Sequence, residues 1–275
     1  MNGLEKIRLF LLDIDGTVCL GDHLIPGADR FLSQIRRNGG EFVFITNNTT
    51  RSVSDYIALF ERLGVPTGPE NFLTASLATA DVLKGKYAQE TIYVLGTESL
   101  MGELRQQGLR VTCDPEDPTI ACVLASYDNQ LTYQKLTDVS RLLTLRKDLG
   151  YMATNPDLVC PVDFGFVPDC GAICEMLEHA VKRRPIYIGK PSTCMVDMAI
   201  RRSRFEKEQA LIVGDRLYTD IACANLSGVS AALVLSGEST RQELQESQYF
   251  ADFVFPSVAE LGDIWEKSRE ILTAG

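Results

Sequence analysis

The chain has 275 residues, of which 45% are hydrophobic and 23% charged, a composition typical of a globular protein with one large domain or two ordinary ones. Its formal net charge of -10 argues against a nonspecific nucleic-acid surface and against an anionic-membrane surface, because both need clustered Lys and Arg. The short apolar run near the N-terminus is interrupted by Asp13 and Asp15, so it predicts neither a signal peptide nor a membrane span.

Short apolar runs alternate with helical patterns along the chain. The expected strands are Ile7–Leu12, Phe42–Ile45, Ile92–Leu95, Ile120–Ala125, Ile186–Ile188, Leu211–Val213 and Ala231–Leu235. The expected helices are Ala28–Asn38, Ser54–Leu63, Ser99–Gln107, Tyr133–Arg146, Ala172–Val181, Thr193–Arg204 and Thr219–Leu226. The strands are apolar on both faces, which is typical of parallel strands covered by helices on each side. The pattern therefore predicts an α/β fold with a doubly wound parallel sheet.

The strand–helix alternation restarts near Ser76 and continues to about Arg184. The polar motifs described next fall only before and after that interval. We therefore expect a core formed by residues 1–75 and 185–275, with an inserted α/β domain over 76–184, which is an ordinary domain size.

Eight cysteines are present, but none is arranged as Cys-x-x-Cys, and two histidines are too few for a zinc cluster. We interpret the cysteines as mostly buried, reduced thiols, which favours a cytoplasmic protein.

Polar residues follow four of the expected strands. In open parallel sheets, ligands bind outside the carboxyl ends of the strands, so these residues would share one site if the strands share one sheet. A single Asp-x-Asp-Gly is more often a solvated turn, but four such strand ends together indicate a site. The four sets are Asp13, Asp15, Gly16 and Thr17; Thr46, Asn47, Asn48 and Thr49; Gly189, Lys190, Pro191 and Ser192; and Gly214, Asp215, Arg216 and Asp220.

These residue types suit phosphoryl transfer. Asp13, Asp15 and Asp215 supply hard oxygen ligands that favour Mg²⁺, which would also relieve the repulsion between the first two carboxylates. Lys190 would neutralise charge on phosphoryl oxygens, and the Thr46 hydroxyl would donate a hydrogen bond to them. One carboxylate can act as nucleophile, and a second can protonate the leaving oxygen. Thr46 could instead cap the next helix, which is compatible with phosphate binding.

The segments "DIDGT", "ITNNTT", "GKPS" and "GDRLYTD" resemble the four motifs of the haloacid dehalogenase superfamily, in the same order. Longer segments resemble one branch, the phosphatases similar to p-nitrophenyl phosphatases, bacterial nucleotide and sugar phosphatases and pyridoxal phosphate phosphatase. These segments are "ITNNTTRSVSDYIALFERLGV", "ATNPDLVCP", "GKPSTCMVDMAI" and "VGDRLYTDIACANLSGVSAALVLSGES". The resemblance covers nearly the whole chain. It implies a Rossmann-like core and a large α/β cap inserted between the second and third motifs.

The resemblance also implies residue roles. Asp13 corresponds to the nucleophile and Asp15 to the general acid/base, and Mg²⁺ would be held by Asp13, the main-chain carbonyl of Asp15, and Asp215. Thr46 and Asn47 would contact the phosphoryl group or the substrate, and Lys190 would bind the phosphoryl group together with Asp13. Asp220 is expected to contact a metal-bound water or Lys190. In the cap, Asn155 and Asp157 are expected either to line the substrate pocket or to form a plain Asx turn.

The expected activity is Mg²⁺-dependent hydrolysis of a small phosphate monoester, such as a sugar phosphate or nucleoside monophosphate, through an aspartyl-phosphate. The expected partner is therefore a small phosphorylated metabolite, with no nucleic acid and no membrane, and a homodimer is left open because such caps often dimerise. Two alternatives stay open, a phosphomutase on the same core and a non-catalytic sensor of phosphorylated metabolites. A dinucleotide-binding oxidoreductase is disfavoured because no Gly-x-Gly-x-x-Gly turn follows the first strand.

Overall fold

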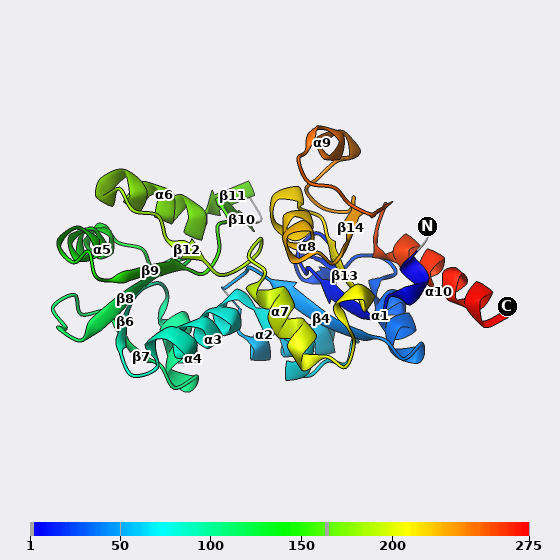
Figure 1. Cartoon of the computed structure of the whole chain (residues 1–275), viewed down its shortest axis with the longest axis horizontal. Helices are drawn as coiled ribbons and strands as arrows, with labels where there is room; N and C mark the ends of the chain where they lie inside the picture. Colours follow the sequence, from blue (N-terminus) through cyan, green and yellow to red (C-terminus); the bar gives the residue numbers. More distant parts are fainter. Residues whose placement is uncertain (1–2, 50, 163–164, 275) are drawn as a thin grey trace. The chain divides into compact units, whose positions relative to one another are not determined.

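The computed structural model describes residues 3–49, 51–162 and 165–274 (Figure 1). The described residues form two compact units. The first unit contains the chain up to Thr46, the segment Val53–Leu73 and everything from Lys190 onward. The second unit contains Asn47–Ser52 and Thr74–Gly189. Each unit has a parallel sheet, so the predicted α/β fold class is confirmed.

The first unit is built on a six-stranded sheet with the order β15-β14-β13-β1-β4-β5. Its strands are β1 (Leu9–Leu12), β4 (Glu41–Thr46), β5 (Phe72–Thr74), β13 (Ala210–Gly214), β14 (Ser230–Val234) and β15 (Phe253–Phe255). β1 lies at the centre and pairs in parallel with β13 and β4, and all four of its residues are buried. This burial explains why the run is apolar on both faces. A two-stranded hairpin, β2 (Cys19–Leu20) and β3 (His23–Leu24), follows β1.

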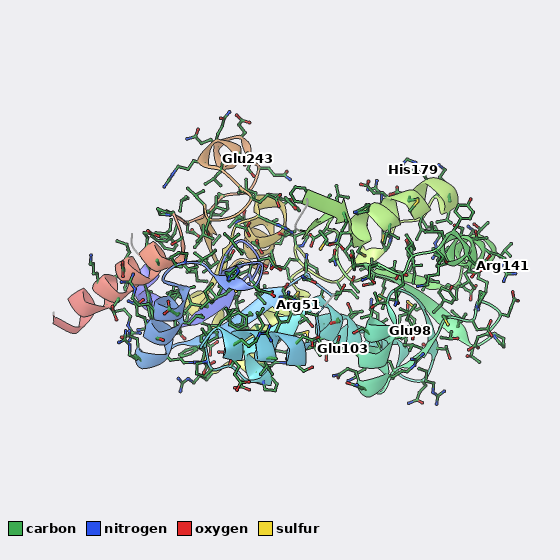
Figure 2. The ribbon with its side chains drawn as sticks, turned by 180° about the vertical axis from the view of Figure 1, so that it is seen from behind. Arg51, Glu98, Glu103, Arg141, His179 and Glu243 are labelled. Carbon is green, nitrogen blue, oxygen red and sulfur yellow. The ribbon has the colours of Figure 1, made fainter. Side chains whose placement is uncertain are left out.

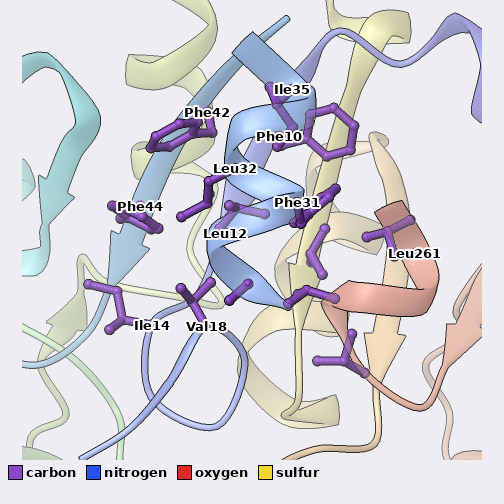
Figure 3. Packing of buried hydrophobic residues seen from close by; sticks show 14 of the residues in the cluster. Phe10, Leu12, Ile14, Val18, Phe31, Leu32, Ile35, Phe42, Phe44 and Leu261 are labelled. Carbon is purple, nitrogen blue, oxygen red and sulfur yellow. The ribbon is translucent and has the colours of Figure 1, made fainter. Parts of the chain in front are cut away.

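Helices supply the rest of the first unit. They are α1 (Ala28–Arg37), α2 (Val53–Arg62), α7 (Cys194–Arg202), α8 (Ala222–Ser227), α9 (Arg241–Glu246) and α10 (Val258–Ala274), with short helical turns η1 (Leu4–Lys6), η2 (Pro69–Asn71), η3 (Lys207–Gln209) and η4 (Leu217–Ile221). Figure 3 shows α1 packed over the sheet, with Phe31, Leu32 and Ile35 directed toward Phe10 and Leu12. The Phe10 ring meets the Phe31 ring edge-on at 5.4 Å between centroids. This aromatic packing fixes the position of β1, whose carboxyl end carries Asp13.

The second unit has its own five-stranded parallel sheet with the order β12-β9-β8-β6-β7. Its elements are α3 (Ala75–Tyr87), β6 (Thr91–Leu95), α4 (Glu98–Gln106), β7 (Arg110–Thr112), β8 (Ile120–Ala125), α5 (Tyr133–Leu145), β9 (Gly150–Ala153), α6 (Cys170–Val181) and β12 (Ile186–Tyr187), with an antiparallel hairpin of β10 (Val159–Val162) and β11 (Gly165–Pro168). A separate hydrophobic core joins this sheet to α5 and α6.

The expectation that Ile186–Ile188 belongs to the same sheet as Ile7–Leu12 is wrong. The segment forms β12, which pairs in parallel with β9 of the second sheet through Ile186 and Met152. The N–H of Gly189 donates to the Thr154 carbonyl at 2.7 Å and extends this pairing by a further residue. An apolar run predicts a strand but does not specify its neighbour. Lys190 belongs to the first unit, but the strand that precedes it belongs to the sheet of the second unit.

Several further elements lay outside the sequence expectations, with α3, β9 and α10 among them. The helix α3 carries small residues and Gly85 in place of a clear apolar stripe, and β9 and α10 likewise went unassigned. Within the part of the chain that the structure describes, no helix combines the length and apolar character needed to cross a membrane.

Candidate active site

The register of the central strands brings Asp13, Thr46 and Asp215 to one edge of the first sheet. Leu12 is aligned with Val213 on one side and with Phe44 on the other. The Asp13 N–H donates to the Val213 carbonyl at 2.9 Å, which continues the ladder one residue past β1. Asp13 and Asp215 therefore follow adjacent strands at the same edge of the sheet, with Asp13 level with Gly214, and Thr46 ends β4 on the other side of β1.

Lys190 lies between two carboxylates at this edge. Its Nζ donates to Asp13 Oδ1 and to Asp220 Oδ1, at 2.6 Å in each case. The Lys190 side chain is 2% exposed and that of Asp220 is fully buried. Asp220 lies in η4, the turn after β13, and its Oδ2 also accepts from the Arg216 N–H at 3.1 Å. The sequence predicted Asp220 as a partner of Lys190 or of a metal-bound water, and in the structure it holds the ammonium group.

The carboxylates of Asp13, Asp215 and Asp220 form one buried cluster. One oxygen from each lies within 4.8 Å of the others, and Lys190 is the cation bonded to two of them. Burial raises the pKa of the Asp13 carboxyl well above its usual range; Lys190 lowers it, while Asp220 and Asp215 raise it further. Burial, followed by the charge of Asp220, raises the pKa of Asp215 to about 6. Burial lowers the pKa of Lys190, but Asp13 and Asp220 raise it more strongly, so the ammonium stays charged.

The donor set of this cluster fits a divalent cation. Three carboxylates face one ammonium, so negative charge is left over in a buried region, where an additional cation is the natural counter-charge. All the side-chain donors are hard oxygens, the ligands that Mg²⁺ prefers. The predicted ligands Asp13 and Asp215 both belong to the cluster, and the side chain of Asp15 does not.

The turn after Asp15 packs directly against Asp215. Gly16 has a φ of +87°, and a Cβ on it would lie 2.5 Å from Asp215 Oδ2. Any other residue here would be strained and would displace the carboxylate. The Thr17 hydroxyl donates to Asp215 Oδ1 at 3.3 Å. The sequence did not indicate this role, because Thr17 had no assigned partner outside its own motif.

Asp15 and Thr46 lie near the cluster without belonging to it. Asp15 is half-buried in the turn that follows β1, and Thr46 is buried at the end of β4. Their assigned roles as general acid/base and phosphoryl ligand remain predictions.

The predicted residues Asn47, Asn155 and Asp157 lie together in the second unit. The Asn155 side-chain amide donates to the Asn47 carbonyl at 3.1 Å, and the Asn47 amide donates to Asp157 Oδ1 at 3.3 Å. The Asp157 N–H in turn donates to Asn155 Oδ1 at 3.0 Å, which is the Asx-type bond that the sequence allowed for. All three side chains are buried. This network ties the segment after β4 into the second unit.

Both histidines are exposed and lie outside the carboxylate cluster. Figure 2 shows His179 on the outer side of α6, and His23 lies in the β2–β3 hairpin.

Comparison with known proteins places this geometry in a family. The chain is 32% identical over 255 residues to the ribonucleotide monophosphatase NagD of Escherichia coli, covering 93% of this chain and 98% of that one. It is 30% identical over 252 residues to an acid sugar phosphatase of Staphylococcus haemolyticus, covering 92% and 94%. Residues 10–110 match the family model described as haloacid dehalogenase-like hydrolase, and residues 187–261 match one described as HAD-hydrolase-like.

The chain belongs to the haloacid dehalogenase-like hydrolases. The two matched segments contain Asp13, Thr46, Lys190 and Asp215, and most of the second unit lies between them. Relatives in this branch are named phosphatases, and the chain is a phosphatase of this superfamily.

Solved structures agree with this assignment. The 4-nitrophenylphosphatase of Thermotoga maritima superposes with a TM-score of 0.88 at 36% identity, covering 96% of this chain and 99% of that chain. A glycerol phosphate phosphatase of Mycobacterium tuberculosis, solved in complex with magnesium, superposes with a TM-score of 0.86 at 29% identity, covering 95% and 78%. Haloacid dehalogenase-like phosphatases use a divalent metal, in agreement with the carboxylate cluster of this chain.

Proposed function

We propose that this haloacid dehalogenase-like phosphatase hydrolyses small phosphate monoesters in a Mg²⁺-dependent reaction that passes through an aspartyl-phosphate on Asp13. The observation that supports this most directly is the bond from Lys190 Nζ to Asp13 Oδ1, because it leaves the other carboxylate oxygen, Oδ2, for attack. The ammonium group also sits where it would offset charge on a phosphoryl group bound to Asp13.

In the first step, an Asp13 oxygen attacks phosphorus and the bond from phosphorus to the leaving oxygen breaks. Asp15 donates its proton to that oxygen, so the alcohol leaves neutral. In the second step, Asp15 takes a proton from water, and the water oxygen attacks phosphorus. The bond from phosphorus to Asp13 breaks, which releases inorganic phosphate and restores the carboxylate. Thr46 and Lys190 would hold the phosphoryl oxygens in both steps, and Asn47 is proposed as a further contact to the phosphoryl group or substrate.

Asp13, Asp215 and the main-chain carbonyl of Asp15 would hold the Mg²⁺. When bound, this cation supplies positive charge that stabilises the phosphoryl oxygens and offsets the repulsion between the carboxylates. Asp220 contributes by holding the Lys190 ammonium group through a second hydrogen bond.

The substrate is proposed to be a small phosphorylated metabolite, since relatives are named for sugar phosphates and ribonucleotide monophosphates. The first unit is proposed as the catalytic core and the second as the cap that sets specificity, with Asn155 and Asp157 as candidate substrate contacts. A cytoplasmic location is proposed because none of the eight cysteines, all in the described part of the chain, forms a disulfide.

Removal of the metal is expected to abolish activity. The purified protein should release p-nitrophenol from p-nitrophenyl phosphate in the presence of Mg²⁺, and excess EDTA should lower the rate by at least about 100-fold, with recovery on adding Mg²⁺. A rate that is unchanged in EDTA would contradict the proposed role of the cluster. A screen of sugar phosphates and nucleoside monophosphates, ranked by kcat/KM, would then identify the substrate class.

Asp15→Asn is expected to slow the second step more than the first. p-Nitrophenol is a good leaving group and needs little protonation, whereas water still needs a base, so hydrolysis of the phosphoenzyme should slow by about 10²–10⁴-fold. Rapid-quench kinetics should then show a burst of about one equivalent of p-nitrophenol per enzyme. Asp29→Asn, which replaces an exposed carboxylate on α1, serves as control and, like the unaltered protein, should show a burst much smaller than one equivalent. Equal steady-state rates in the two variants would argue against the acid/base role.

A further inference from the structure

A loop outside the four short motifs holds Asp215 at two points. The loop joins β14 to α9. Its Glu238 N–H donates to Asp215 Oδ2 at 2.7 Å, and its Ser239 N–H donates to the Asp215 carbonyl at 3.1 Å. The side chain and the main chain of Asp215 are therefore both fixed by consecutive backbone donors of one loop.

The same loop also holds the turn that follows Asp15. The Ser236 hydroxyl donates to the Gly16 carbonyl at 2.8 Å. Between these two anchor points, a Cβ on Gly237 would lie 2.0 Å from Asp215 Oδ2. The loop thus approaches the Asp215 carboxylate so closely that only glycine fits at position 237.

An ion pair also joins this loop to Arg216, the residue after Asp215. Arg216 Nε lies 2.9 Å from Glu238 Oε2, and the Arg216 side chain is only 16% exposed. The Arg216 N–H bonds to Asp220, which in turn holds Lys190. The loop is therefore joined through side chains and main chain to both the carboxylate cluster and its ammonium group.

We propose that Ser236, Gly237 and Glu238 are positioning residues that set the affinity of the carboxylate cluster for its divalent cation. They act by orienting the Asp215 carboxylate and by fixing the backbone next to the Asp15 carbonyl. Asp215 and the Asp15 carbonyl are two of the proposed ligands, and they come from separate parts of the chain. Groups that hydrogen-bond to metal ligands typically change metal affinity by about 10–100-fold when removed. The inference depends on the cation site of the proposed function.

Direct measurement of Mn²⁺ binding tests this inference without relying on turnover. Free Mn²⁺ is followed by electron paramagnetic resonance during titration of the full chain. Ser236→Ala removes the bond to Gly16 and should weaken Mn²⁺ binding by on the order of 10-fold, while Ser236→Thr, which keeps the hydroxyl, should restore most of it. Gly237→Ala should weaken binding by on the order of 100-fold, because the new Cβ displaces the Asp215 carboxylate.

Ser247→Ala is the matched control. Ser247 lies just after α9, where its hydroxyl accepts from the Tyr249 N–H at 3.0 Å, so this variant also loses one local hydrogen bond. It should bind Mn²⁺ like the unaltered protein. If Gly237→Ala does not fold, the comparison of Ser236→Ala with Ser236→Thr still decides the question.

The Asp215→Asn variant separates failure of this inference from failure of the proposed function. If Asp215→Asn loses Mn²⁺ binding while Ser236→Ala keeps the affinity of the unaltered protein, the loop does not set the affinity and the inference is overturned. If Asp215→Asn also binds Mn²⁺ normally, the cation site itself is misassigned, which overturns both. A loss that Ser236→Ala shows and Ser236→Thr reverses supports the inference.

Discussion

Asp13→Asn should reduce turnover of p-nitrophenyl phosphate by at least about 10³-fold while leaving the protein folded. The amide has nearly the same shape as the carboxylate but is a poor nucleophile, and loss of an enzyme nucleophile costs on the order of 10³–10⁶ in kcat. The replacement also removes one of three buried negative charges that share a single lysine. Thermal stability should therefore be retained, since Lys190 keeps its bond to Asp220.

A second measurement, beside turnover, tests the nucleophile directly. Acid quench with labelled substrate should trap a phosphoenzyme that hydroxylamine cleaves in the unaltered protein, and none in Asp13→Asn. Asp81→Asn, which changes an exposed carboxylate on α3, is the control and should match the unaltered protein in both assays. Activity of Asp13→Asn near that of the control would rule out Asp13 as the nucleophile.

Lys190→Met should have the second large effect, and here both activity and stability should fall. Removing one partner of a buried ion pair costs about 3–5 kcal/mol because the remaining charge is left uncompensated. Lys190 compensates two buried carboxylates, Asp13 and Asp220, so the midpoint of thermal unfolding should drop by on the order of 10 °C. The kcat should fall by at least about 100-fold, because charge on the phosphoryl group is no longer offset.

A double variant distinguishes lost compensation from lost packing. Adding Asp220→Asn to Lys190→Met removes one uncompensated charge, so the double variant should unfold at a higher temperature than Lys190→Met alone. Lys135→Met is the matched control in the second unit, where Lys135 pairs with the buried Asp128 at 2.7 Å but is itself 30% exposed. It should lose less stability and keep its activity on p-nitrophenyl phosphate. A double variant less stable than Lys190→Met would contradict the electrostatic explanation.

The sequence predicted the elements whose apolar patterns are continuous. Ile120–Ala125 is β8 with the bounds expected, and the helix predicted from Tyr133 begins there as α5. The pairing of strands was harder to predict from the sequence. The residues Ile186–Ile188 have the composition of any parallel strand, and only the structure shows that they pair with β9. The small, mixed residues of α3 gave no periodic signal at all.

For the site, charged residues at strand ends were informative and loop residues were not. Asp13, Lys190, Asp215 and Asp220 were predicted as a set, and the structure brings them together. The sequence did not predict Ser236–Glu238 as part of the site, because Ser, Gly and Glu after a strand are as typical of an ordinary solvated turn as of a functional loop. Their relation to Asp215 depends on backbone N–H groups, and every residue except proline has one, so no side-chain type marks such a donor in a sequence.

The assignment of Asn47–Ser52 to the second unit has a practical consequence for protein production. A recombinant fragment cut at the obvious limits, Thr74 and Gly189, would lack this short segment. Its buried Asp157 would lose the amide of Asn47, the Asn155 amide would lose its carbonyl partner, and Ser126 would lose its contact with Thr49 at 3.3 Å. Each of these hydrogen bonds contributes about 0.5–1.5 kcal/mol net, because the groups that lose it can bond to water instead. An independently folding version of this unit would need the missing segment grafted back onto it.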